Sequence, residues 1–246
     1  MIPPTSIDGT DITGATIDGT DVQEITVDGD VVFSAQQLDP SLIVRLRFEQ
    51  NVNNEISSLT PTDSTSAGYS SDAEEGSFAK DFDGSNDAVI FTDSQFSFSN
   101  FYNVPHSVSM QIKTGVTQVL ALLGGTFKSS SDDRHRMFVA GDELRFNRLN
   151  TNFAATTVVT DNQYHHVVFT YGGTSTGSMN IYVDGSPEAS GSRATALSDL
   201  NEKFEIGYNQ QESRHPYDGL IDDYRIYMKE LSSSEVSNLY NTGFTQ

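Results

Sequence analysis

Short runs of alternating apolar and polar residues recur along most of this chain, separated by clusters of Gly, Asn, Asp and Ser. The run 42–48 (LIVRLRF) places Leu, Val, Leu and Phe on one face and both arginines on the other, and 107–113 and 179–183 alternate in the same way. Successive side chains of a strand point to opposite faces, so this period predicts strands with one buried face. About a dozen such runs at short spacing are typical of a sandwich of two antiparallel sheets. The sequence therefore predicts an all-β jelly-roll sandwich.

One short helix is predicted near the C-terminus. Ser232 and Glu235 have the spacing of a capping box, in which each residue's side chain bonds the backbone N–H of the other. The residues Val236, Leu239 and Tyr240 then form one apolar stripe. We expect this helix to dock on the sandwich through that stripe.

Residues 1–37 differ from the rest because an Asp-Gly pair recurs every ten residues, at 8–9, 18–19 and 28–29. Asp-Gly favours type I′ hairpin turns, which need positive φ at both central residues. We therefore predict a meander of three or four very short strands; the alternative, a calcium-binding β-roll, repeats at nine residues with more Gly. So small a meander cannot bury enough apolar surface to be stable alone. We expect it to pack on the main domain, 38–246, or on another chain.

The charge balance excludes several classes of partner. The chain has 14 Lys and Arg against 34 Asp and Glu, a net charge of 14 − 34 = −20, and it has neither Cys nor Trp. Binding to nucleic acid depends on clustered cations, so we expect no nucleic-acid partner. No run approaches the roughly 18 apolar residues of a membrane span, so we expect no membrane insertion. A carboxylate-rich surface poor in Lys stays hydrated when salt screens its charges, and we interpret it as halophilic.

Five motifs occur in a fixed order between residues 46 and 227: LRFEQN, FDGSNDAV, NQYHHVVFTY, IYVDG and DGLIDDYRIY. Together they resemble the laminin-G-type domains of the concanavalin A-like superfamily. The resemblance covers nearly all of residues 40–241 and implies that family's jelly roll, which hosts lectins, adhesive modules and hydrolases. Tyr164 stands where the family usually has Trp. Residues 1–37 resemble the small N-terminal modules of tailed-virus virion and tail proteins.

Catalytic motifs are not found in the sequence. Glucanases on this scaffold resemble Glu-x-Asp-x-x-Glu along one strand, and no such run occurs here. The nearest pairing, Glu202 with Glu205, has a three-residue spacing that sends the two carboxylates to opposite faces of a strand. His165 and His166 are adjacent and for the same reason cannot chelate one ion, so we expect one of them to be packed and hydrogen-bonded. We predict that the protein is not an enzyme.

Asp222 is the candidate metal ligand. If Tyr224 and Ile226 face the core, alternation turns Asp222 inward as well, where a carboxylate must be paired, hydrogen-bonded or metal-bound. The resemblance implies calcium at the sandwich rim in many relatives. Two alternatives follow: a structural Ca²⁺ held by Asp222, with Glu49 as the possible partner although alternation places it opposite Phe48, or a hydrogen-bonded Asp222 without metal.

Two predicted loops, 129–136 and 209–217, concentrate Arg and His in a chain poor in cations. Arg is suited to bidentate contact with carboxylates, phosphates or acidic sugars. The alternative is that both are solvated loops with local ion pairs. The candidate ligand-binding residues are Arg134, His135, Arg136, Arg214, His215 and Tyr217.

Our main functional hypothesis is a virion structural protein: a capsid decoration, head fibre or tail fibre. Residues 1–37 would bind other virion proteins and further copies of this chain, and the lectin-like domain would contact a host cell-surface glycan or glycoprotein. The first residues, MIPPT, begin neither a basic nor an apolar signal region, so export by the general route is not expected if this is the natural start. The resemblance implies a domain that normally works outside the cell, which conflicts with the lack of an export signal. Assembly inside a cell and release in a particle would resolve this conflict. The halophilic composition points to an archaeal tailed virus. The alternatives are a secreted carbohydrate-binding or adhesion module and a glycoside hydrolase.

Overall fold

A computed structural model describes residues 6–7, 10–11, 24–27, 30–34, 39–64, 67–92, 101–127, 134–197, 203–210 and 213–242. The chain divides into two compact units, residues 1–40 and residues 41–245. In the first unit β1 (Ser6–Ile7) pairs with β2 (Thr10–Asp11), and β3 (Glu24–Val27) pairs with β4 (Asp30–Ser34). Each antiparallel pair flanks one predicted Asp-Gly turn in the sequence, whereas the middle Asp-Gly pair lies outside the described residues. The anchoring role of residues 1–37 stays a prediction.

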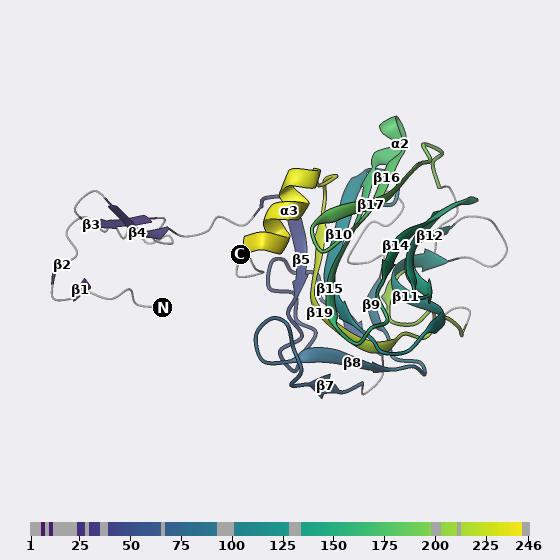
Figure 1. Ribbon diagram of the computed structural model, residues 1–246, viewed down its shortest axis with the longest axis horizontal. Helices are drawn as coiled ribbons and strands as arrows, with labels where there is room; N and C mark the ends of the chain where they lie inside the picture. Colours follow the sequence, from purple (N-terminus) through teal and green to yellow (C-terminus); the bar gives the residue numbers. More distant parts are fainter. Residues whose placement is uncertain are drawn as a thin grey trace. The chain divides into compact units, whose positions relative to one another are not determined.

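The second unit is the predicted two-sheet sandwich (Figure 1). Within the described residues one sheet has eight strands, and β5 pairs beside β8 along β19. Its order is β17 (Ser186–Ser192), β16 (Ser178–Val183), β15 (Tyr164–Gly172), β10 (Pro105–Lys113), β19 (Asp218–Tyr227), β8 (Ala79–Asp83) and β7 (Tyr69–Ser70), with β5 (Leu42–Leu46) off this path.

The opposite sheet has seven strands among the described residues, again antiparallel. A four-residue helix, α2 (Gly173–Thr176), follows β15. The seven-stranded order is β14 (Thr151–Val158), β13 (Glu143–Arg148), β12 (Arg134–Gly141), β11 (Gln118–Phe127), β18 (Lys203–Ile206), β9 (Val89–Thr92) and β6 (Thr62–Asp63).

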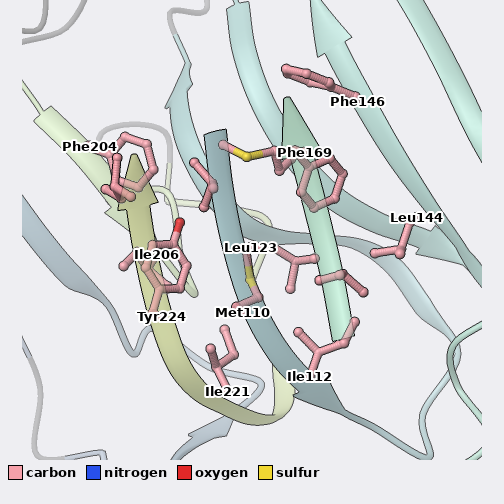
Figure 2. Close-up of a cluster of buried hydrophobic side chains, with 14 of the residues drawn as sticks. Met110, Ile112, Leu123, Leu144, Phe146, Phe169, Phe204, Ile206, Ile221 and Tyr224 are labelled. Carbon is pink, nitrogen blue, oxygen red and sulfur yellow. The ribbon is translucent and has the colours of Figure 1, made fainter. Parts of the chain in front are cut away.

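The main core lies between the two sheets and is built from the apolar residues that alternate along each strand. Figure 2 shows Met110 and Ile112 of β10 facing the interior together with Phe169 of β15 and Tyr224 of β19. All four side chains are buried. The period-two prediction is therefore confirmed, because burying one face of each sheet requires that alternation.

The C-terminal helix α3 (Ser233–Thr242) covers the other side of the eight-stranded sheet (Figure 1). The predicted capping box is present, since the Glu235 N–H donates to Ser232 Oγ at 3.3 Å and the Ser232 N–H donates to Glu235 Oε2 at 2.8 Å. Val236 and Leu239 pack in a second apolar cluster, as predicted. Tyr240 departs from the predicted stripe: it is 44% exposed and stacks on His166, with 6.1 Å between ring centroids.

Two register shifts, one between β19 and β5 and one between β19 and β10, change the predicted facing of neighbouring residues. A register shift against β5 moves Leu42 from the main core to the α3 cluster, whereas Val44 and Leu46 stay in the main core. A second shift, against β10, coincides with a positive φ of 40° at Asp223. An extra residue in one strand reverses the side-chain alternation beyond it, so strict periodicity fails at both places.

No helix in the described part of the chain combines the length and apolar character needed to cross a lipid bilayer.

Candidate functional site

The first group of predicted ligand residues lies on strand β12, where neighbouring residues point to opposite faces of the sheet. Met137 and Val139 belong to the core, so Arg136 and Phe138 lie on the outer face of the seven-stranded sheet. The expectation that residues 134–136 form a loop is therefore wrong, because β12 begins at Arg134. The preceding residues, 128–133, and the Arg134 side chain lie outside what the structure describes.

His135 points into the sandwich and is fully buried. Its ring lies 5.2 Å from that of Tyr102, 5.1 Å from that of Phe146 and 5.6 Å from that of Tyr171, measured between centroids. A side chain enclosed in this way cannot contact a ligand at the surface. His135 is therefore corrected from a ligand-binding residue to a structural one.

A directional chain of hydrogen bonds fixes the protonation of two buried histidines. Arg148 Nη1 lies 3.0 Å from His135 Nδ1, and because arginine can only donate, that ring nitrogen is the acceptor. His135 Nε2 must then carry the proton and donate to His106 Nε2 at 2.9 Å. His106 in turn donates from Nδ1 to the Val104 carbonyl at 2.9 Å. Both rings are neutral, since burial lowers the pKa of His106 to about 3 and that of His135 well below its usual range.

Arg148 also holds two connecting segments against the sandwich. Its guanidinium donates to the Tyr102 carbonyl at 2.8 Å, to Asn103 Oδ1 at 3.1 Å and to the Thr195 carbonyl at 3.0 Å. The same group lies 4.2 Å from the Tyr171 ring centroid. Segments 101–104 and 193–197 are thus fastened to β13 from inside the fold.

The outer face of the seven-stranded sheet brings Arg136 and Glu205 to the two sides of one glycine. Gly125 of β11 is in register with Arg136 of β12 and with Glu205 of β18. Phe204 and Ile206 face the core, so Glu205 points outward like Arg136. The Arg136 guanidinium carbon lies 4.6 Å from the Phe138 ring centroid. Burial raises the pKa of Glu205, which is 2% exposed, to about 7.

The second predicted loop reaches the same face through Glu205. The Gln210 N–H donates to Glu205 Oε1 at 3.2 Å, and Asn209 and Arg214 form a bridge that closes the loop. Arg214 is exposed and His215 is half-buried. The structure therefore places the loop of Arg214 and His215 beside β18, which β11 separates from the strand of Arg136.

Tyr217 does not belong to this surface. Its ring is buried in the main core, and its hydroxyl lies 3.4 Å from the Lys113 carbonyl and 3.3 Å from the Leu220 carbonyl, to which it donates. It is therefore corrected from a ligand-binding residue to a core residue. Aromatic residues next to exposed loops are often core anchors, and the sequence alone does not separate the two roles.

Asp222 and Glu49 converge on one loop by accepting its backbone N–H groups. Asp222 Oδ2 accepts from Glu74 at 3.0 Å and from Glu75 at 2.8 Å, and Glu49 Oε1 accepts from Ser77 at 2.8 Å. Asp222 is fully buried, but on the face of its β10 partner Gln111 rather than on that of Tyr224. The predicted facing is wrong because the shift at Asp223 reverses the alternation.

Calcium at Asp222 and Glu49 stays a prediction. Among the described residues no group of three or more His, Asp or Glu side chains is arranged to hold a metal ion. The amide contacts satisfy Asp222 without metal, so the alternative of a hydrogen-bonded Asp222 predicts the same melting temperature in calcium and in EGTA. A fall in EGTA that disappears in Asp222→Asn would instead support bound calcium.

His165 and His166 confirm the prediction that adjacent strand residues separate. His165 lies between Asp184 Oδ2, 2.9 Å from Nδ1, and Asp161 Oδ1, 3.2 Å from Nε2. These carboxylates raise its pKa. His166 instead lies 2.9 Å from Ser109 Oγ. Both contacts are structural.

Three residues of this region were missed by the sequence analysis. Arg148 continues the inward alternation of Leu144 and Phe146, and that period was the available signal. Asn147 lies on the outer face in register with Arg136. Glu205 was considered only as a catalytic partner of Glu202, which lies outside the described residues.

The family model described as the concanavalin A-like lectin/glucanases superfamily matches residues 83–237. Among curated proteins no sequence matches the chain.

Several solved structures share the fold at low sequence identity. The binding domain of Paraclostridial Mosquitocidal Protein 1 has a TM-score of 0.68 at 13% identity, over 83% of this chain and 53% of that one. A structure of botulinum neurotoxin type C, whose cell entry depends on interaction with two ganglioside molecules, has a TM-score of 0.62 at 16% identity. The match covers 82% of this chain and 51% of that one. The chain thus spans about half the length of these toxin chains.

A third structure has nearly the extent of the sandwich alone. It is Domain 4 of AbnA, a GH43 extracellular arabinanase from Geobacillus stearothermophilus, in complex with arabinotriose. The TM-score is 0.62 at 18% identity, over 81% of this chain and 98% of that domain. At sequence identities this low, the TM-scores show a shared fold alone.

Proposed function

The chain belongs to the concanavalin A-like lectin/glucanase superfamily, and from this we propose that its sandwich is a non-catalytic, lectin-like module that binds a glycan. The observation that carries the proposal is the likeness to Domain 4 of the arabinanase, which was solved with arabinotriose and is matched over 98% of its length. A fold of that extent is a complete binding module in the arabinanase. The structure of botulinum neurotoxin type C, whose cell entry depends on two ganglioside molecules, gives the same indication for cell-surface glycans.

We place the binding surface on the outer face of the seven-stranded sheet, around Arg136, Glu205 and the loop of Arg214. This face holds the Arg136 guanidinium, the Phe138 ring and the Glu205 carboxyl group, which are 9%, 2% and 2% exposed, beside the exposed Arg214. A sugar would therefore reach Arg214 first and would contact Arg136 only after side chains of this face move. Sugar recognition needs donors and acceptors held in fixed positions beside apolar surface. The strands supply that rigidity, since both Arg136 and Glu205 lie in the sheet.

These observations favour the carbohydrate-binding alternative over virion display. A virion location, a halophilic archaeal host and assembly through residues 1–37 stay predictions. The division of the chain at residue 40 is compatible with an anchor followed by a binding module. Deleting residues 1–37 would test the anchor by its effect on oligomeric state, whereas glycan binding by the sandwich should persist.

Removing the two arginines of this surface should weaken glycan binding. We expect the double variant Arg136→Gln, Arg214→Gln to bind immobilised oligosaccharides at least about tenfold more weakly, because a hydrogen bond to a charged group contributes about 1.5–3 kcal/mol and about 1.4 kcal/mol corresponds to a factor of ten. Binding of the full chain to a panel of neutral and acidic oligosaccharides measures this.

A matched control removes two cations elsewhere, Arg47→Gln with Lys229→Gln, and should leave binding unchanged. Both residues lie outside the proposed binding surface, where Arg47 forms an ion pair with Glu49 and Lys229 forms one with Glu235. Equal binding by the two double variants would show that the arginines of the outer face make no contact with the sugar.

A further inference from the structure

Asn147 carries a buried acceptor atom to which no described residue donates. The side chain is 5% exposed, and its Nδ2 donates to the Thr151 carbonyl at 3.1 Å. Its Oδ1 is buried and accepts no hydrogen bond within the part of the chain that the structure describes. Buried polar atoms in native proteins are nearly always paired, so an exception of this kind points to a group that is supplied from outside.

The residue directly across the ladder offers the complementary chemistry. Arg136 of β12 is in register with Asn147 of β13, and both side chains are on the outer face of the sheet. A guanidinium can only donate hydrogen bonds, whereas the free Oδ1 can only accept them. Cross-strand neighbours on one face have Cβ atoms about 4.5–5.5 Å apart, so one small group can reach both.

A hydroxyl group satisfies both partners at once, because it accepts one hydrogen bond and donates another. A carboxylate would satisfy Arg136 but would bring a second bare acceptor against Oδ1 of Asn147. We propose that the Arg136–Asn147 pair binds a hydroxyl of an uncharged sugar, and that neutral glycans are therefore the ligand class of this module. This inference rests on the proposed function and narrows it, since Arg alone would have indicated acidic sugars.

The interior of the fold holds this pair in place. The neighbouring pair on the same two strands is His135 with Arg148, which points inward and is fixed by the chain of hydrogen bonds to His106 and the Tyr102 carbonyl. A site whose supporting residues are locked by packing and hydrogen bonds binds with less loss of freedom. Because Oδ1 is covered in the free protein, sugar binding includes a local side-chain rearrangement, as is common at binding surfaces.

The test compares neutral and acidic oligosaccharides on the full chain and on Asn147→Leu. The probes are arabinotriose with other neutral oligosaccharides, and a matched set containing uronic acids. We expect the wild type to prefer the neutral set and Asn147→Leu to lose at least about tenfold in affinity for it. Its melting temperature should change little, because the variant loses the hydrogen bond to the Thr151 carbonyl and also removes an unpaired buried acceptor. The matched control is Asn238→Leu, at an exposed position of α3, which should bind as the wild type does.

Each outcome separates this inference from the function on which it rests. Neutral binding that survives Asn147→Leu, or a wild type that prefers acidic sugars, overturns the inference and leaves glycan binding intact. A wild type that binds no oligosaccharide in either set overturns both. If Asn147→Leu fails to fold, Asn147→Asp serves instead, because its carboxylate would pair with Arg136 and take the guanidinium from the sugar; unchanged neutral binding by that variant overturns the inference.

Discussion

Replacing Arg148 by methionine will lower the free energy of unfolding by about 3–5 kcal/mol, because each buried acceptor that loses its donor costs about 1–3 kcal/mol. Arg148 is fully buried and donates to two backbone carbonyls, to Asn103 Oδ1 and to His135 Nδ1. Methionine fills the space but leaves these acceptors without their donor inside the fold. In a domain of this size the loss corresponds to a melting temperature lower by about 10 °C. Thermal and denaturant melts of the full chain measure it.

Two further variants distinguish the contribution of the Arg148 hydrogen bonds to stability from the contribution of its charge. Arg148→Lys keeps the charge but has three donors in place of the planar fork, so we expect an intermediate loss. Arg214→Met removes an exposed guanidinium and should change the melting temperature by little. Hydrogen exchange in Arg148→Met should be faster at segments 101–104 and 193–197, which Arg148 holds. Unchanged exchange at both segments would contradict the role that we assign to this residue.

Replacing Glu205 by glutamine will stabilise the protein at pH 8 and have little effect at pH 4. Burial raises the pKa of Glu205 from 4.5 to about 7. Between these values the folded state keeps a proton that the unfolded state has lost, so Glu205 makes stability fall as pH rises through this window. A shift of 7 − 4.5 = 2.5 at about 1.36 kcal/mol per pKa unit gives about 3 kcal/mol once both states are ionised.

Glutamine removes this penalty because it stays neutral and can still accept the Gln210 N–H. Chemical denaturation at pH 4 and at pH 8 measures the difference between variant and wild type. Glu143→Gln is the control on the same sheet, since its carboxylate is 45% exposed and pairs with Arg145. A gain from Glu205→Gln that is the same at both pH values would mean that Glu205 is not protonated in the folded protein near neutral pH.

The two histidines of the interior network act in the opposite direction. The pKa of His106 is lowered to about 3 in the folded state. Below about pH 6.5 the unfolded state is therefore protonated at His106, whereas the folded state is not. Its contribution is fully present above that value and is lost as pH falls. Neutral His106 therefore contributes to the loss of stability in acid, together with His166, and Glu205 contributes to the loss in alkali, together with Asp222.

The sandwich could be predicted from the sequence because burial of one sheet face imposes a period of two. The positions around Met110 and Met179 alternate over whole strands, and both side chains lie in the core. The capping box at Ser232 and Glu235 could be predicted for a similar reason, since its contacts span three residues. Local rules of this kind do not depend on which strands become neighbours.

The candidate site could be predicted only in part. Arg136, Arg214 and His215 were identified from composition, and Arg136 and the loop that carries the other two meet on one face through Glu205. His135 and Tyr217 were wrongly included, because residue type does not reveal which side of a strand or loop a side chain takes.

What the sequence by itself determined about this protein is its all-β class, its terminal helix and the inward and outward faces of its regular strands. Only the tertiary structure decided that Asp222 turns away from the core, because a register shift between β10 and β19 depends on strand pairing. It also decided that Arg148 reaches His135 and that Asn147 lies across from Arg136. Pairings between strands join residues that are distant or irregularly spaced in sequence, and the free energy that selects one register comes from the packing of the whole sandwich.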